Sequence, residues 1–258
     1  MPRIPILRIA SLACAIWAAE ILPTTAFDLQ GHRGARGLAP ENTLAAFRTA
    51  IALGVTTLET DLAVTSDGVL VISHDPALNP DLVRDADGKW LASPGPAIRT
   101  LSAADLATYD IGRVNPESRY AKQFPEQKPA DGERFPTLAQ VFALGGPGMR
   151  FNIEIKTDPT KPDLTLAPEP FAALVVKAIR EAKVGERTTI QSFDWRGLLA
   201  ARRLAPDIAT ACLSIESNNM DTVGRAGGKP SPWLGGLDLQ AHGGSVPRLA
   251  NAAGCAVW

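Results

Sequence analysis

The sequence is poor in histidine and cysteine, with three of each among 258 residues, and its net charge at pH 7 is only -1. The near-neutral charge gives no reason to expect nucleic acid or an anionic membrane surface as a partner. Zinc sites draw their ligands largely from histidine and cysteine, so their scarcity argues against a zinc protein. No internal repeat or low-complexity tract stands out.

A hydrophobic run long enough to span a bilayer comfortably is also lacking. The most apolar stretch lies at the N-terminus, where Arg3 and Arg8 stand near its start and Glu20 and Pro23 interrupt its end. Small residues follow, as at the cleavage site of a secretory signal. Residues 1–26 are therefore predicted to be a signal peptide rather than an ordinary first helix, and the chain is predicted to be exported to the periplasm or secreted.

Strand-like and helix-like segments alternate through the rest of the chain, which predicts a parallel α/β domain over residues 27–258. The length and the 45% hydrophobic content suit a single (β/α)₈ barrel. Helices are predicted at 41–53, 170–183, 195–204 and 247–253, with shorter ones after the capping residues Ser102 and Thr137. The eight predicted strands are 27–30, 56–64, 69–73, 151–155, 188–192, 208–213, 237–240 and 256–258.

Two regions break the alternation, and the end of the chain is unusual. Residues 65–68 form a turn that is too short for a helical crossover between strands. Residues 76–135 form a long insertion or loop region, rich in proline, glycine and charge, and loops of this length usually serve or cover a site. The chain ends at Trp258 inside a strand-like run, so the eighth strand is expected to be cut short and the final helix to be missing.

Three carboxylates occur in apolar, strand-like contexts. Glu59 and Asp61 are two residues apart, so both side chains point to one face of a strand. Glu154 shares a face with Asn152 and Lys156 on another strand. An alternating strand with a solvated polar face would explain the pattern, but buried carboxylates require a cation or basic partners. Oxygen ligands favour one divalent cation, Ca²⁺ or Mg²⁺.

Two of the histidines stand near these carboxylates at predicted strand ends. His32 lies in a glycine-flanked turn, and His74 follows an apolar strand, so the two are predicted to form a general acid–base pair. Arg33 and Lys156 supply the positive charge that a phosphoryl group requires. His242 lacks such a context and is assigned no catalytic role.

The cysteines leave one question open. Cys14 lies in the predicted signal peptide, so only Cys212 and Cys255 remain in the mature chain. They can pair in an oxidising compartment, but both stand in apolar, strand-like surroundings where buried free thiols are common.

The candidate residues belong to motifs that follow one another along the chain: Gly31-His32-Arg33-Gly34, Ala39-Pro40-Glu41-Asn42-Thr43, Glu59-x-Asp61, Asp67-Gly68, His74-Asp75 and Glu154-Ile155-Lys156. In order and in spacing, these motifs strongly resemble those of the glycerophosphodiester phosphodiesterases. The resemblance extends from about Leu29 to Trp258 and favours the periplasmic branch of the family. It implies a (β/α)₈ TIM barrel of the phospholipase C-like phosphodiesterase type, with the site at the C-terminal ends of the strands.

The resemblance also implies a role for each candidate residue. Gln191 and Phe193 would line the substrate pocket, and Glu41 and Asn42 would fix the first loop and the start of its helix. The remaining roles divide into three groups: metal ligands Glu59, Asp61 and Glu154; acid–base residues His32 and His74; and phosphate-binding residues Arg33 and Lys156.

The implied reaction is hydrolysis of small glycerophosphodiesters, such as glycerophosphocholine or glycerophosphoethanolamine, to an alcohol and sn-glycerol 3-phosphate. Three alternatives remain: an inactive truncated copy or a phosphodiester-binding protein, a related barrel phospholipase acting on intact lipid, and a sugar hydrolase using two of the carboxylates. The last leaves both histidines and Arg33 without a role.

Overall fold

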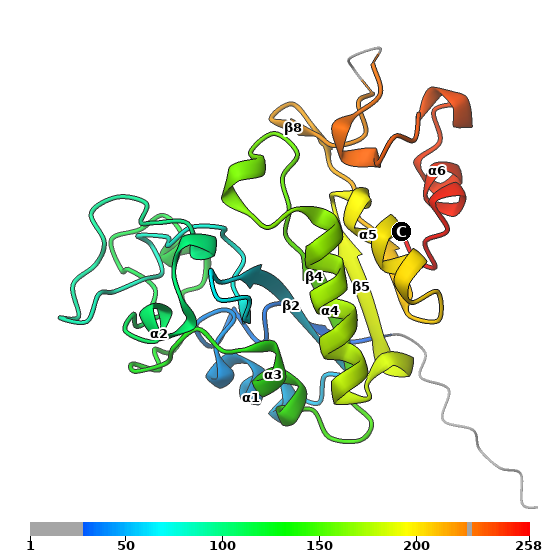
Figure 1. Ribbon diagram of the computed structural model, residues 1–258. Helices are drawn as coiled ribbons and strands as arrows, with labels where there is room; N and C mark the ends of the chain where they lie inside the picture. The colour runs from blue at the N-terminus through cyan, green and yellow to red at the C-terminus, as the bar shows by residue number, and fades with distance from the viewer. Residues whose placement is uncertain (1–27, 226–228) are drawn as a thin grey trace, which may run out of the picture.

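A six-stranded sheet forms the centre of the computed structural model, which describes residues 28–225 and 229–258 (Figure 1). The predicted signal peptide lies outside the described residues. Five strands run parallel in the order β1-β2-β4-β5-β6, and β3 pairs with β2 in the antiparallel direction. The strands are β1 (Gln30–Gly31), β2 (Thr57–Val64), β3 (Leu70–Ile72), β4 (Arg150–Ile155), β5 (Thr188–Ser192) and β6 (Ala209–Cys212).

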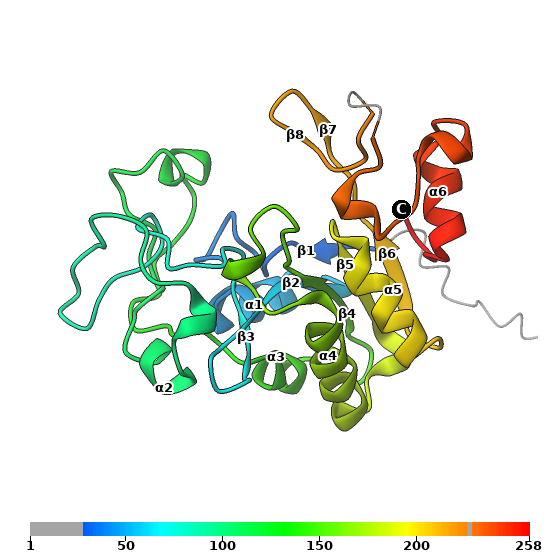
Figure 2. The ribbon, with the colours of Figure 1, turned by 45° about the horizontal axis from the view of Figure 1, so that its top comes forward.

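Helices α3, α4 and α5 cover one face of this sheet (Figure 2). Phe171 of α4 and Trp195 of α5 are fully buried in the same hydrophobic core as strand residues such as Leu58 and Phe151. Burial of these large apolar side chains is the main force that fixes the helices on the sheet. The helices are α1 (Leu44–Ala52), α2 (Ala103–Leu106), α3 (Leu138–Leu144), α4 (Pro168–Ala182), α5 (Trp195–Leu204) and α6 (Val246–Ala253).

The helix signals in the sequence are confirmed, with small shifts in position. Helix α5 has the predicted bounds, and its cap Asp194 accepts a hydrogen bond from the Arg196 amide. Ser102 and Thr137 both form the expected capping boxes. Helix α1 begins at Leu44 rather than at residue 41, because Thr43 caps it. None of the described helices is both long and apolar enough to cross a membrane.

Some of the predicted strands differ from those in the structure. The strand predicted at 237–240 is wrong: these residues form a loop that leads into a 3₁₀ turn, η6 (Gln240–His242), and the Asp238 side chain stabilises it by accepting from the Gln240 amide at 2.9 Å. At 256–258 the chain makes only a single parallel bridge, between Val257 and Ala211. Strand β3 is antiparallel because the turn before it is tight. The described sheet is therefore an open arc rather than a closed ring of eight strands.

The long insertion, residues 76–135, is built around a small hydrophobic cluster of its own and lies to one side of the sheet (Figure 1). It contains α2 and the short 3₁₀ turns η1 (Ile98–Thr100) and η2 (Ala121–Gln123). The buried members of the cluster are Ala63, Val71, Leu78, Val83, Ile98, Leu106 and Ile111. Because Ala63 and Val71 belong to β2 and β3, the insertion is anchored directly to the sheet.

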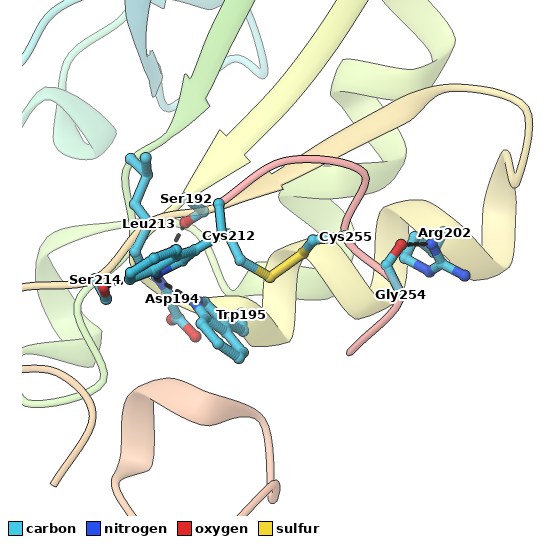
Figure 3. Close-up of a disulfide and its surroundings, with 10 residues drawn as sticks. Ser192, Asp194, Trp195, Arg202, Cys212, Leu213, Ser214, Gly254 and Cys255 are labelled. Atoms are coloured by element: carbon cyan, nitrogen blue, oxygen red, sulfur yellow. Dashed lines mark hydrogen bonds between the residues drawn. A yellow bond between two sulfur atoms is a disulfide. The ribbon is translucent and has the colours of Figure 1, made fainter. Parts of the chain in front are cut away.

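A disulfide links Cys212 at the end of β6 to Cys255 after α6 (Figure 3). The Cys212 amide also donates to the carbonyl of Val257 at 3.0 Å, and the Ala256 amide donates to the carbonyl of Thr210 at 2.8 Å. The two cysteines are thus paired, and the bond ties the segment after α6 to the edge of the sheet. A two-stranded hairpin, β7 (Glu216–Ser217) and β8 (Met220–Asp221), lies between these elements in the sequence, and the other 3₁₀ turns are η3 (Pro162–Leu164), η4 (Gly185–Arg187) and η5 (Pro232–Leu234).

Candidate active site

The three predicted carboxylates come together on adjacent parallel strands. Asp61 of β2 pairs in register with Glu154 of β4, and Glu59 lies two residues earlier on the same face of β2. One carboxylate oxygen of each lies within 4.8 Å of the others, and all three residues are buried. Strand register alone therefore gathers three acidic groups into one buried cluster.

This cluster is short of positive charge. Burial and the neighbouring Asp61 carboxylate raise the pKa of Glu59 to about 8. Burial, opposed by Lys156 and reinforced by Asp61, raises the pKa of Glu154 to about 7. Burial disfavours ionisation of Asp61 as well, but Lys156, His74 and Arg33 outweigh it and lower the pKa of that carboxyl. Three ionised carboxylates at this spacing require a further cation.

The donor atoms fit a hard divalent cation. Oδ1 of Asp61 is buried and accepts no hydrogen bond from any described residue, and Nζ of Lys156 lies 3.4 Å from it. A buried carboxylate oxygen rarely lacks a partner, so this atom is available to a metal. The donors are all oxygen, as Ca²⁺ and Mg²⁺ prefer. Glu59, Asp61 and Glu154 can therefore hold a metal ion.

The turn containing His32 passes directly over this cluster. Arg33 adopts a left-handed conformation with φ of 54°, and its amide donates to Oε2 of Glu59 at 2.8 Å. Gly34 follows with φ of 75°, and a Cβ atom there would lie 2.6 Å from the carbonyl carbon of Ala46 in α1. Only glycine fits so close to a helix backbone in this conformation. The turn places the half-exposed His32 with Nε2 3.8 Å from Glu59.

The Arg33 side chain is held by two carboxylates. Its Nη1 donates to Oε1 of Glu41 at 2.9 Å, and its Nε lies 3.2 Å from Oδ2 of Asp61. Nδ2 of the Asn42 side chain donates to the same Asp61 oxygen at 3.0 Å. Glu41 and Asn42 thus do more than fix the loop, because both contact residues of the site. Burial, followed by repulsion from Arg36 and Arg33, lowers the pKa of His32 to about 4.

His74 approaches the cluster from the end of β3. Its Nδ1 lies 3.0 Å from Oδ1 of Asp75, whose other oxygen accepts from the Asn79 side chain at 2.6 Å. This arrangement orients the imidazole, and Nε2 has no hydrogen-bond partner among the described residues, so it is available for proton exchange. Asp75 belongs to the His74-Asp75 motif, but no local pattern predicted that its side chain orients the histidine.

Gln191 lies beside the acidic cluster. Its Nε2 donates to Oε1 of Glu59 at 2.8 Å, and its Oε1 accepts from Asn152 at 2.9 Å. Asn152 donates in turn to Gln30 at 2.9 Å. The structure thus places Gln191 as a hydrogen-bond partner of a candidate metal ligand and brings Asn152, for which only the shared face was predicted, into the same network.

An open cleft of about 220 Å³ extends from the acidic cluster. Glu154, His74 and Lys156 are among its lining residues, and Nζ of Lys156 donates to Oε1 of Glu154 at 2.9 Å. Phe193 and Trp233 belong to its apolar lining. The cleft therefore joins charged groups suited to a phosphoryl group to a less polar wall. All the predicted site residues lie in or around the cluster and this cleft.

The family to which these features belong is defined by sequence comparison. The model of the glycerophosphoryl diester phosphodiesterase family matches residues 32–241, which include every candidate residue. This chain belongs to the glycerophosphoryl diester phosphodiesterase family.

Curated members of the family are similar over most of this chain. A glycerophosphodiester phosphodiesterase of Caldanaerobacter subterraneus subsp. tengcongensis is 31% identical over 183 residues, which cover 70% of this chain and 64% of that protein. A glycerophosphodiester phosphodiesterase of Bacillus subtilis is 30% identical over 198 residues, covering 74% and 60% respectively. The matched region thus spans somewhat under two thirds of the length of these relatives.

Solved structures of the family share the fold. A protein from Silicibacter pomeroyi DSS-3, assigned to the glycerophosphoryl diester phosphodiesterases, is 31% identical and superposes with a TM-score of 0.75 over 88% of this chain and 72% of its own. A phosphodiesterase from Oleispira antarctica in complex with the product sn-glycerol 3-phosphate is 26% identical, with a TM-score of 0.55 over 74% and 68%. The family relationship implies the TIM-barrel, phospholipase C-like fold, of which the parallel sheet described above is an arc.

Two residues near this family site were not predicted from the sequence. Arg36 lies close enough to His32 to lower the pKa of that imidazole. Tyr120 of the insertion donates a hydrogen bond to Glu41. Arg36 lies in the matched stretch after Arg33, whereas Tyr120 lies 79 residues beyond Glu41, and no local pattern connects the two.

Proposed function

We propose that this protein is a metal-dependent hydrolase of small glycerophosphodiesters that releases an alcohol and sn-glycerol 3-phosphate. The observation that supports this most directly is the juxtaposition of the Glu59, Asp61 and Glu154 cluster with His32 and His74 in a family member. Two imidazoles next to an oxygen-ligand cation site form the acid–base and electrostatic machinery of a phosphodiester hydrolase.

The phosphodiester would bind where the cleft meets the acidic cluster. A bound Ca²⁺ or Mg²⁺ supplies positive charge to a phosphoryl oxygen as negative charge develops there. Lys156 and Arg33 add fixed positive charge on two sides of Asp61. Phe193 would contact the organic part of the diester, since it lines the apolar wall of the cleft.

The two histidines divide the proton transfers between them. Asp75 orients His74 through Nδ1, which suits donation of a proton from Nε2 to the leaving alcohol. Burial, reinforced by the cationic side chains of Arg36 and Arg33, disfavours the protonated form of His32, which suits acceptance of a proton from the nucleophile. Water can serve as that nucleophile and give sn-glycerol 3-phosphate directly. If a neighbouring hydroxyl of the glycerol moiety attacks instead, the alcohol leaves with formation of a cyclic phosphate, which water then opens to sn-glycerol 3-phosphate.

The test is the nature of the products released from glycerophosphocholine by the purified chain. The proposal predicts sn-glycerol 3-phosphate and choline with Ca²⁺ or Mg²⁺, and neither with chelator. Glu154→Gln should abolish turnover, whereas Glu169→Gln, a surface control paired with Arg203, should not. Binding of the diester without products would make the protein a phosphodiester-binding protein, and products from intact lysophospholipid alone would make it a phospholipase.

We also propose that the protein is exported to an oxidising compartment, the periplasm or the exterior. The disulfide between Cys212 and Cys255 supports this, because such bonds persist mainly outside the reducing cytosol. Fractionation of cells expressing the full chain should recover it outside the cytoplasm, with residues 1–26 removed and no free thiol. Recovery of the full-length, reduced chain in the cytoplasm would contradict the proposal.

A further inference from the structure

The segment from Ser118 to Lys128, within the long insertion, lies directly against the loop that follows His32. Nε2 of Gln127 donates to the carbonyl of Arg36 at 2.7 Å, and the amide of Lys128 donates to the carbonyl of Leu38 at 2.9 Å. One side-chain and one backbone hydrogen bond therefore attach this segment to the loop that carries Arg33.

Two aromatic rings reinforce the attachment. The guanidinium carbon of Arg36 lies 5.2 Å from the centre of the Phe124 ring, a cation–π contact. The Phe124 ring packs edge to face against Tyr120, with centroids 5.1 Å apart and an interplanar angle of 66°. These contacts hold the Tyr120 ring in place independently of the hydrogen bond that its hydroxyl makes.

The Tyr120 hydroxyl donates to Oε2 of Glu41. The other oxygen of Glu41 accepts from Arg33, whose side chain lies 3.2 Å from Asp61. Glu41 is only 6% exposed, so its carboxylate must find its donors within the protein. A continuous chain of contacts therefore runs from the insertion through Glu41 and Arg33 to the acidic cluster.

We propose that Tyr120 is a positioning residue for the reaction: through Glu41 it holds the Arg33 guanidinium in place against Asp61. This inference rests on the proposed function, because it assigns Arg33 to the charge that develops on the phosphoryl group. It also assigns a function to the insertion, because its residues, which are far from the catalytic motifs in the sequence, help to hold the active-site loop in position.

Loss of the hydroxyl should act on turnover more than on substrate binding. Without it, one oxygen of the buried Glu41 carboxylate lacks its protein donor, and the carboxylate must turn toward water. Arg33 then loses its fixed support. A displaced Arg33 guanidinium stabilises the transition state less well, because the negative charge that it opposes develops there. For Tyr120→Phe, kcat should therefore fall roughly tenfold while KM changes by about twofold or less.

The experiment compares Tyr120→Phe, Glu41→Gln and the double variant with Tyr109→Phe as the matched control. The sequence contains two tyrosines, and Tyr109 packs on the separate hydrophobic cluster of the insertion. We measure kcat and KM for glycerophosphocholine with saturating Mg²⁺, together with the melting temperature. Because Tyr120 acts through Glu41, its substitution should have little further effect on kcat in the Glu41→Gln background.

A second measurement does not depend on turnover. The Nε–H resonance of Arg33 reports the environment of its guanidinium, and Tyr120→Phe should shift it while Tyr109→Phe leaves it unchanged. If the wild type hydrolyses no glycerophosphodiester, the proposed function fails and this resonance alone decides whether Tyr120 positions Arg33. An unshifted resonance overturns the inference, as do an unchanged kcat, equal losses in both tyrosine variants, or full additivity of Tyr120→Phe with Glu41→Gln.

Discussion

Replacing Glu59 with glutamine should make the metal-free protein more stable at neutral pH. The substitution removes one of three buried carboxylates, formed with Asp61 and Glu154, whose oxygens lie within 4.8 Å of one another. Without a cation, these charges repel one another in a site that excludes water. The Glu59 carboxylate, which serves to bind the metal, thus lowers the stability of the folded protein when the metal is absent.

The magnitude follows from the pKa of Glu59, which burial and Asp61 raise from 4.5 to about 8. The folded state keeps the proton while the unfolded state releases it, so the free energy of unfolding falls by about 1.4 kcal/mol per pH unit. The stability that protonated Glu59 contributes to the folded state is fully present below pH 4.5 and declines as pH rises toward 8. By pH 7 the free energy of unfolding has fallen by about 3 kcal/mol. Glutamine offers only one of the two oxygen acceptors that Arg33 and Gln191 use. The lost hydrogen bond lowers the stability of the variant by about 1 kcal/mol. The net gain is about 2 kcal/mol.

Urea unfolding measures this difference directly. In chelator, Glu59→Gln should be more stable than wild type at pH 7, and the advantage should disappear near pH 5. With millimolar Mg²⁺ or Ca²⁺ the order should reverse, because only the wild type retains all three ligands. The surface variant Glu169→Gln should match the wild type throughout. Loss of stability in Glu59→Gln at both pH values, with no stabilisation of the wild type by either cation, would refute the electrostatic account.

Three further predictions concern the disulfide, the active-site turn and the second carboxylate strand. Replacing Cys212 and Cys255 together by alanine should lower the free energy of unfolding by about 4 kcal/mol, as expected for cysteines 43 residues apart; chemical denaturation should show it, and an unchanged midpoint would mean that the bond adds no stability. Gly34→Ala should cost about 2 kcal/mol or more, because its Cβ would meet Ala46 at a positive φ, and a normal melting temperature would contradict this. Calorimetry should show loss of divalent-cation binding in Glu154→Gln, and wild-type affinity would exclude it as a ligand.

The sequence predicted those parts of the site that depend on local pattern. The spacing of Glu59 and Asp61 places them on one face of a strand, and Glu154 stands in an equivalent context on another. Strand register then brings Asp61 beside Glu154. The helices were predicted for the same reason, since caps such as Asp194 act within one turn.

What could not be predicted depends on contacts between residues far apart in the sequence. Tyr120 reaches Glu41 across 79 residues, and Gln191 reaches Glu59 across 132. The pairing of Cys212 with Cys255 likewise required the three-dimensional structure. The strand predicted at 237–240 failed for a different, local reason: a short apolar run does not by itself establish a strand, and the hydrogen bond from the Gln240 amide to the Asp238 side chain stabilises a turn there.

The central claim is that His32 and His74 perform acid–base chemistry beside a divalent-cation site. The most direct test is kcat for glycerophosphocholine, with saturating Mg²⁺ or Ca²⁺, in His32→Ala, His74→Ala and His242→Ala, the last replacing the remaining histidine, which lies in η6. The account predicts that the first two lose roughly a hundredfold or more while binding the cation as tightly as wild type, and that His242→Ala keeps its activity. Wild-type turnover in His32→Ala or His74→Ala would contradict it.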